Sequence, residues 1–134
     1  MTVSEAIALA DALKPNQIER ERKIEWLSRL DQWVFEQVIT PREKDENTPT
    51  SFTPYCPPYT DDDLDEDPGD QELLIPAPFD ETYRFYLEMQ IDLANLETDK
   101  YMSDLALYQN ARGQFLRDYN RKHRRLDRCW WHRF

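Results

Sequence analysis

Cysteine and histidine side chains near the C-terminal end are the first residues of this chain that could do chemistry. Cys129 and His132 stand in the run "CWWH", at a spacing that half of a zinc site could use. A closed structural zinc site needs four ligands, and the remaining candidates are His123 and the distant Cys56. Unligated tail residues are therefore the favoured interpretation, and no metal site is predicted. In a reducing compartment both cysteines are expected to stay free thiols.

An acidic run in the middle of the chain resembles a calcium-binding loop only superficially. Counting from Asp61, Glu72 falls at the twelfth position, where such loops carry a bidentate glutamate. Position six, however, is Glu66 instead of the required glycine, and Pro68 interrupts the run. A solvated loop whose charges repel one another is the favoured interpretation.

The motifs of common enzymes do not occur in the sequence. Gly69 and Gly113 are the two glycines, and neither stands in a phosphate-binding loop. No serine sits in a nucleophile elbow, and both histidines lie in the basic tail. An enzyme is left without a candidate nucleophile, base or cofactor site, so we expect neither catalysis nor a cofactor.

Basic residues are concentrated at the C-terminal end of an otherwise acidic chain. The formal net charge of −10 opposes binding to DNA or anionic lipid. The tail "RKHRRLDRCWWHRF" nevertheless interleaves arginine with tryptophan and phenylalanine. Such a segment could anchor in a protein groove, stack on nucleic acid bases or sit at a membrane interface. The plain alternative is a helix end enriched in cations, followed by frayed residues. A protein groove is favoured, because the acidic remainder of the chain opposes the other two partners.

The elements that must position these residues are predicted to be helical. A chain of 134 residues fits one domain with a small core, and its 33% of charged residues and two glycines favour helices over a turn-rich β fold. We expect a helical domain at 1–122, which contains an irregular loop at 41–72, and a tail at 123–134. No apolar run is long enough to span a bilayer, and the start of the sequence lacks the features of a signal peptide, so a cytoplasmic protein is expected.

Capping residues and proline mark two helices in the first third of the chain. Thr2 and Glu5 have the spacing of a capping box, which predicts a helix over 3–13 that Pro15 ends. Asn16, with Glu19 at the reciprocal position, predicts the start of a second helix that Pro41 ends. Beyond it, prolines and acidic residues remove all periodicity up to residue 72.

An extended segment and a helical hairpin are predicted for the second half. Pro76 and Pro78 make "ELLIPAP" extended, either as an edge strand or as a buried strap. Asp80 is a suitable N-cap for a third helix with an unusually wide apolar face. A fourth helix over roughly 99–122 follows. The turn between them lacks glycine and proline, but one continuous helix could not fold back to make a core, so a hairpin is preferred.

The order of these segments resembles the head-tail connector (adaptor, or neck) proteins of long-tailed bacteriophages and prophages. The similarity covers Thr2 to His123, and its most specific part is "LL-P-P-D--Y--YLE-QIDLAN", which begins at Leu73. The other matching segments are "EAIALADALKPNQI", "KIEWLSRLDQWVFEQVI", "DDDLDED" and "YMSDLALYQNARGQFLRDYNRKH". The segment 42–58 and the tail after His123 depart from the family's pattern.

The resemblance implies a structural role in the virion. It implies an all-α, four-helix bundle that assembles as a twelvefold ring below the portal protein, extends the DNA channel and contacts the next neck or tail-completion protein. It implies no enzymatic activity and no cofactor, and it places the protein in the virion neck after assembly in the host cytoplasm. Apolar faces too wide for one small core are expected in a ring, because each subunit presents two patches to its neighbours.

Three groups of residues are assigned on this hypothesis. Neighbouring copies are expected to cover Trp26, Trp33, Tyr86 and Met89. The channel or its tailward rim is expected to be lined by Asp61, Asp62, Asp63, Asp65, Glu66 and Asp67, so that DNA passes without specific binding. Grooves of the portal are expected to receive Arg124, Arg125, Arg128, Trp130, Trp131 and Phe134. The alternative is a DNA-binding or DNA-packaging regulatory protein that uses the basic segment from Arg117 to Arg133 on phosphates. No membrane partner is expected.

Overall fold

The regular secondary structure of the described residues is helical. The computed structural model describes residues 1–43, 48–55 and 71–123. Its helices are α1 (Val3–Leu13), α2 (Arg20–Val34), the π-helical turn η1 (Phe35–Ile39), α3 (Glu81–Ala94) and α4 (Thr98–Lys122). Within these residues the β structure consists of isolated bridge residues, among them the pair Thr2 and Glu72, and no strand is formed. The predicted all-α class is confirmed at this level.

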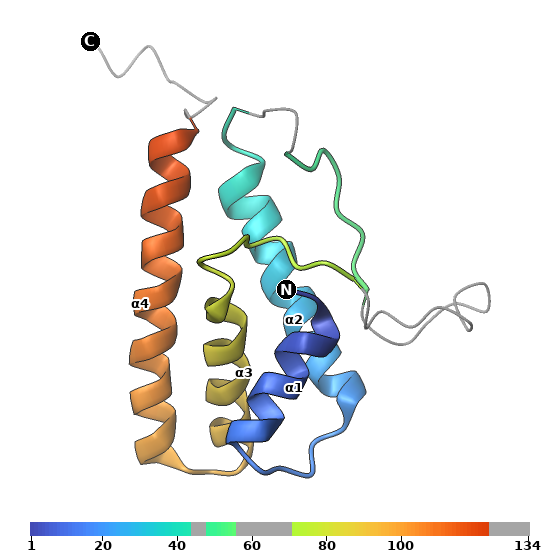
Figure 1. The fold of residues 1–134 in the computed structure, drawn as a ribbon, viewed down its shortest axis with the longest axis vertical. Coiled ribbons are helices and arrows are strands. Elements are labelled where there is room, and N and C mark those ends of the chain that lie inside the picture. Colours follow the sequence, from blue (N-terminus) through green and yellow to red (C-terminus); the bar gives the residue numbers. More distant parts are fainter. Residues whose placement is uncertain (44–47, 56–70, 124–134) are drawn as a thin grey trace, which may run out of the picture.

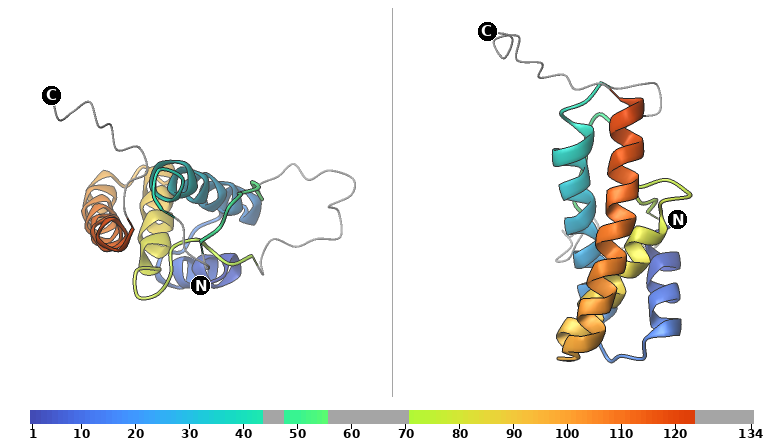
Figure 2. Two further views of the ribbon diagram at one scale, coloured as in Figure 1. Left: turned by 90° about the horizontal axis from the view of Figure 1, so that it is seen from above. Right: turned by 90° about the vertical axis from the view of Figure 1, so that its left-hand side faces the viewer.

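Helix α3 occupies the centre of the arrangement. It packs most extensively against α4 and also contacts α1 and α2. Figure 2 shows α4 on one side of α3 and α1 and α2 on the other. An inner helix must be apolar on both sides, and Tyr83, Leu87 and Ile91 are all completely buried. The wide apolar face of α3 is therefore largely covered inside the subunit.

The first helix has the predicted bounds and the predicted cap. The hydroxyl oxygen of Thr2 accepts a hydrogen bond from the backbone N–H of Glu5 at 3.3 Å. The prediction for the second helix is wrong at its start, because α2 begins at Arg20 with Glu19 as the N-cap residue. The Asn16 side chain instead accepts from the N–H of Ile18 at 3.1 Å, so it shapes the connection between the helices.

The proline-rich segment 72–78 before α3 crosses the other elements, and we call it the strap (Figure 1). The N–H of Leu73 donates to the carbonyl of Met1 at 3.0 Å, and Leu73 and Ile75 are buried. The strap thus joins the core, as one of the two predicted alternatives requires. Asp80 does precede α3, but its side chain makes no capping bond and lies 3.9 Å from the α-amino group of Met1.

A tight turn connects α3 to α4, which confirms the predicted hairpin. Leu96 adopts a φ of 59° and so reverses the chain without glycine. That conformation is disfavoured for a residue with a Cβ atom. The pairing of α3 with α4 holds the turn in place, and it leaves the Leu96 side chain 85% exposed.

Candidate functional site

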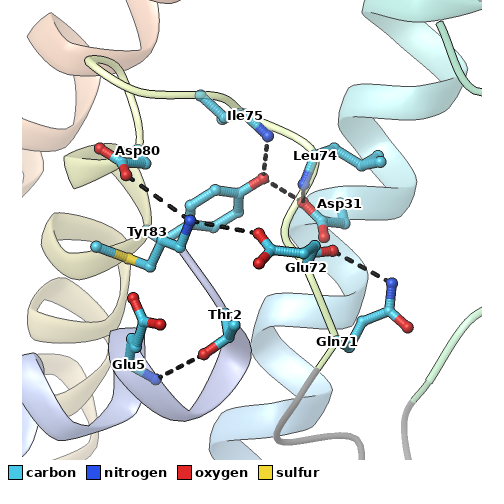
Figure 3. A network of polar contacts seen from close by, with 10 residues as sticks. Thr2, Glu5, Asp31, Gln71, Glu72, Leu74, Ile75, Asp80 and Tyr83 are labelled. Atoms are coloured by element: carbon cyan, nitrogen blue, oxygen red, sulfur yellow. Dashed lines mark hydrogen bonds and ion pairs between the residues drawn. The ribbon is translucent and has the colours of Figure 1, made fainter. Parts of the chain in front are cut away.

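A buried carboxylate, Asp31, joins three separate segments of the chain. Asp31 lies on the inner side of α2 between the apolar residues Leu27 and Val34, and all three are buried. The hydroxyl of Tyr83 on α3 donates to Oδ1 of Asp31, and the hydroxyl of Tyr55 donates to Oδ2 at 2.8 Å. Figure 3 shows Asp31 and Tyr83 facing each other below the strap. We call this group, together with the backbone of Leu74 and Ile75, the Asp31 junction.

The strap is attached to the same junction through its backbone. The N–H of Leu74 donates to Oδ1 of Asp31 at 3.4 Å, and the N–H of Ile75 donates to the hydroxyl oxygen of Tyr83 at 2.7 Å. Tyr83 therefore donates one hydrogen bond and accepts another, which uses the hydroxyl fully. The backbone N–H of Tyr55 also donates to the hydroxyl oxygen of Ser28 at 3.2 Å. These bonds fix residues 55, 74 and 75 to α2 and α3.

Burial changes the acidity of the Asp31 junction. Loss of water raises the pKa of Asp31 to about 6, although its hydrogen bonds from Tyr83, Tyr55 and Leu74 favour the charged form. Burial, and then the neighbouring Asp31 charge, hold the pKa of Tyr83 well above its usual value. Because Asp31 is 0% exposed, a substrate could not reach the carboxylate. The junction is suited to holding segments together and not to catalysis.

A second buried cluster joins the end of α1 to the helical hairpin. Nζ of Lys14 lies 2.9 Å from Oδ2 of Asp92 on α3 and 2.8 Å from Oδ2 of Asp104 on α4. The Asp92 side chain is 1% exposed and that of Asp104 is 11% exposed. Glu88 is also buried, and Nε of Arg84 lies 4.0 Å from its carboxylate. We call Lys14, Asp92 and Asp104 the Lys14 cluster.

The Lys14 cluster contains more carboxylates than cations, and the acidities reflect this. Burial, and then a hydrogen bond with Asp104, raise the pKa of Asp92 to about 6, while Lys14 acts in the opposite direction. Burial lowers the pKa of Lys14, but its bonds to Asp104 and Asp92 outweigh that effect, so the pKa is raised. Burial also raises the pKa of Glu88. The cluster can therefore take up a proton in mildly acidic solution.

Metal binding and membrane insertion find no support in the described residues. Within 1–43, 48–55 and 71–123, histidine, cysteine and acidic side chains do not form a group of three that could hold a metal ion. Nor does any described helix combine the length and the apolar character needed to cross a bilayer. Cys56, Cys129 and His132, the metal-ligand candidates of the sequence apart from His123, lie outside the described residues.

The four residues predicted at a subunit interface have different environments. Trp33 is 37% exposed, whereas Trp26 and Tyr86 are partly buried and pack against the core. Met89 is 5% exposed and belongs to the core, which corrects its assignment to an interface. The physical reason is the central position of α3, because α1 and α4 contact it and the subunit itself buries Met89.

Trp33 belongs to an aromatic and cationic face formed by three helices. The guanidinium of Arg112 on α4 lies 5.3 Å from the Trp33 ring and 5.2 Å from the ring of Tyr108. Tyr108 in turn lies 5.3 Å from the ring of Tyr86 on α3. These distances permit cation–π and aromatic contacts. Arg112 thus covers part of Trp33, and 37% of the residue stays open to solvent.

A group of exposed leucine and methionine residues was not found from the sequence. The C-terminal ends of α1 and α3 and the start of α4 lie together at one end of the molecule (Figure 1). We call this end the apolar end, after its exposed apolar side chains. These are Leu13 (58%), Leu93 (49%), Leu96 (85%) and Met102 (57%). Helical periodicity places Leu13 on the apolar stripe of the first helix and Leu93 and Leu96 on the wide apolar face of the third. It does not show that these side chains stay exposed at one end of the molecule.

The acidic and tail assignments cannot be placed. The predicted rim residues from Asp61 to Asp67 and the predicted docking residues from Arg124 to Phe134 lie outside the described residues. At the end of α4, Arg121 and Lys122 pair with Asp118 at 2.8 Å and 3.1 Å. Nη1 of Arg42 donates to the carbonyl of His123 at 3.2 Å. The tail therefore starts beside the connection that follows η1.

No protein-family model matches the sequence, and comparison with the curated proteins and with the solved structures gives no match. The resemblance to phage connectors therefore stays a prediction from the sequence segments quoted above.

Proposed function

We propose that this chain is a structural subunit of a phage neck, which docks as a ring under the portal protein and links the capsid to the tail. On this proposal the molecule is a four-helix bundle with a long acidic, proline-rich loop and a basic aromatic tail. The observation that carries it is the apolar end, where Leu13, Leu93, Leu96 and Met102 are each about half exposed or more. Leaving such a group in water is unfavourable, and a neighbouring subunit would remove it from water.

Two surfaces of different chemistry suit a ring. In a closed ring of identical subunits, each copy must offer one patch to the neighbour on its left and another to the neighbour on its right. The apolar end and the face around Trp33 and Arg112 differ in chemistry, although α3 and α4 contribute residues to both. We assign them as the two patches of the ring contact. These two patches replace the subunit interface predicted from the sequence, which included the buried residue Met89.

The charge of the chain supports passage of DNA instead of binding. A ring of about twelve copies would carry on the order of a hundred net negative charges, which repel the phosphates of DNA. Near the end of α4, Arg121 and Lys122 already pair with Asp118. DNA would then slide through the ring without the phosphate contacts that would hold it.

The direct test uses the purified protein mixed with the portal protein of the same phage. Native mass spectrometry and negative-stain imaging should show a ring attached to the portal. The double variant Leu13→Glu/Leu96→Glu should abolish the ring, because both positions are exposed and the change spares the core. Gln109→Glu also introduces a glutamate at an exposed site, on α4 and outside the apolar end, and this variant should leave the ring intact.

Three results would each overturn the proposal or one part of it. A ring that forms normally with the double variant would remove the apolar end from the contact. Tight binding of the free protein to double-stranded DNA, with an affinity that falls steeply with salt, would favour a DNA-binding or packaging regulator instead. Deleting residues 126–134 should abolish portal attachment, so a truncated protein that still co-purifies with portal would refute the role of the tail.

A further inference from the structure

A small groove lies between the first turns of α3, together with residues 78–79 before it, and the middle of α4, and both apolar and polar residues line it. Its apolar lining comes mainly from Phe79 and Phe85 on one side and from Leu107 and Ala111 of α4 on the other, with Glu81 among the polar residues. Leu107 is 46% exposed, so the groove is open to solvent. Its volume is about 220 Å³.

The size and lining of the groove favour a single aromatic anchor. Pockets for small molecules are larger, at about 300–1,000 Å³. Pockets that receive one aromatic side chain of a protein partner are typically apolar with polar groups at the edge. Here aromatic rings and an aliphatic side chain supply the apolar walls, and Glu81 supplies a negative charge that suits a neighbouring arginine.

We propose that this groove is the docking site for the C-terminal segment 124–134 of the same chain, with Trp130 or Trp131 as the anchor. The segment carries two adjacent tryptophans among arginines, which matches an apolar groove beside a carboxylate. The inference goes beyond the proposed function, because it concerns the free chain before it meets any partner.

The length of the segment agrees with the position of the groove. Leu107 lies about 24 Å from His123 along α4, at ~1.5 Å per residue, and Ala111 lies about 18 Å from it. Trp130 stands seven residues after His123, so an extended chain of up to ~3.5 Å per residue spans about 25 Å. The indole of Trp130 therefore reaches the groove if the segment runs back along α4, and a much shorter tail would not.

Docking within one chain has a clear thermodynamic advantage. The tail is covalently attached to the end of the helix that forms one wall of the groove, so its effective concentration there is high, on the order of millimolar for a short linker that can span the distance. A weak contact can therefore be well populated in the free chain. The tryptophans would be removed from water until a partner with a better groove takes their place.

The test measures the distance between the tail and the groove in the full-length chain. Cys56→Ser leaves Cys129 as the single thiol, and a nitroxide attached there stands next to Trp130. In the ¹⁵N-labelled protein, the nitroxide should strongly reduce the amide signals of Leu107 and Ala111. The amide signals of Leu9 and Leu96, on α1 and in the α3–α4 turn, should keep their intensity.

Two variants distinguish docking of the tail in the groove from a nonspecific approach of the tail to the protein surface. Leu107→Glu should restore the Ala111 signal, whereas Leu9→Glu should not, although the two leucines are similarly exposed at 46% and 42%. If Leu107→Glu perturbs the fold, the variant Trp130→Ser/Trp131→Ser tests the same contact by changing the tail instead of the groove. It should also restore the signal.

The remaining outcomes overturn the proposal. Full intensity at Leu107 and Ala111 in the spin-labelled chain would show that the tail does not dock there. A mixture of ¹⁵N-labelled chain without nitroxide and unlabelled chain with nitroxide reports contacts between copies. Signal loss at Ala111 that is as strong in this mixture would assign the groove to the tail of a second copy. None of these measurements uses the portal, so their failure leaves the neck proposal to its own test.

Discussion

Replacing Tyr83 by phenylalanine should destabilise the fold strongly, because one hydroxyl group serves two partners. The variant removes the hydrogen bond to the buried Asp31 carboxylate, and bonds to charged groups contribute about 1.5–3 kcal/mol. It also leaves the N–H of Ile75 without its acceptor, and Ile75 is 1% exposed. An unsatisfied buried donor costs about 1–3 kcal/mol. Because the two effects share one group, we expect a total loss of about 3 kcal/mol.

Urea unfolding followed by circular dichroism measures this loss. With a slope of about 1–3 kcal/mol per molar urea, the midpoint should fall by roughly 1–3 M while the slope stays constant. Tyr101→Phe is the matched control, since Tyr101 is a partly buried tyrosine that packs against the same core. Its loss should stay below about 1 kcal/mol.

The pH dependence provides a second signature of the same bond. Asp31 has a pKa of about 6, so it is charged at neutral pH and neutral in mild acid. A bond to a neutral carboxyl is weaker than a bond to a carboxylate. The stability difference between wild type and Tyr83→Phe should therefore shrink as the pH falls below about 6. The reasoning would be refuted if Tyr83→Phe cost no more than Tyr101→Phe, or if the difference grew towards acid pH.

Three further variants test the charged groups. The pKa of Asp92 is about 6 in the folded chain against an ordinary value of 3.8. Its charge therefore destabilises the fold fully above about pH 6, and the effect disappears as the pH falls towards 4. Asp92→Asn should therefore be more stable than wild type at neutral pH, by up to about 3 kcal/mol, and should lose that advantage near pH 4. Lys14→Met leaves two adjacent carboxylates, Asp92 and Asp104, without their cation and should cost about 3 kcal/mol. Arg112→Ala should cost about 1 kcal/mol and should shift the Trp33 fluorescence to longer wavelength as the indole loses its cover.

Each of these variants has an exposed counterpart on α4. Asp99→Asn, Lys100→Met and Arg117→Ala change the same residue types at exposed positions, and each should alter stability by less than about 0.5 kcal/mol. An Asp92→Asn variant that is less stable than wild type at neutral pH would contradict the raised pKa. Equal losses for Lys14→Met and Lys100→Met would show that Lys14 does not compensate the charges of Asp92 and Asp104. Unchanged fluorescence in Arg112→Ala would contradict the cation–π contact.

Local signals in the sequence predicted the helices well. The capping residues Thr2 and Glu5 and the following Pro15 bound α1 correctly, and the wide apolar face of α3 was recognised. Periodicity and caps are local properties, so one sequence contains enough information to find them. Asn16 was misplaced as a cap because an asparagine can form several local turns, and the sequence does not show which one is used.

The buried polar groups could not be predicted in the same way. Asp31 lies on the apolar stripe of α2. An analysis of helical periodicity counts an acidic residue at such a position as a break in the stripe and not as a buried group. Its partners Tyr55, Leu74 and Tyr83 lie 24, 43 and 52 residues further along the chain. Pairs so distant depend on how the elements pack, and a single sequence does not specify that packing. The Lys14 cluster was missed for the same reason.

The Lys14 cluster lies next to the apolar end, so the proposed assembly should change the protonation of its carboxylates. Lys14 directly follows Leu13 of the apolar end, and its side chain is 20% exposed, so water still reaches one side of the cluster. A neighbouring subunit that covers Leu13 would remove this water, and further desolvation would raise the pKa of Asp92 above about 6. Assembly would then take up a proton at neutral pH and become stronger in mild acid. Calorimetry of assembly in two buffers with different ionisation enthalpies should give different heats, and Asp92→Asn should remove the difference. Equal heats for the wild type would place the subunit contact away from this end.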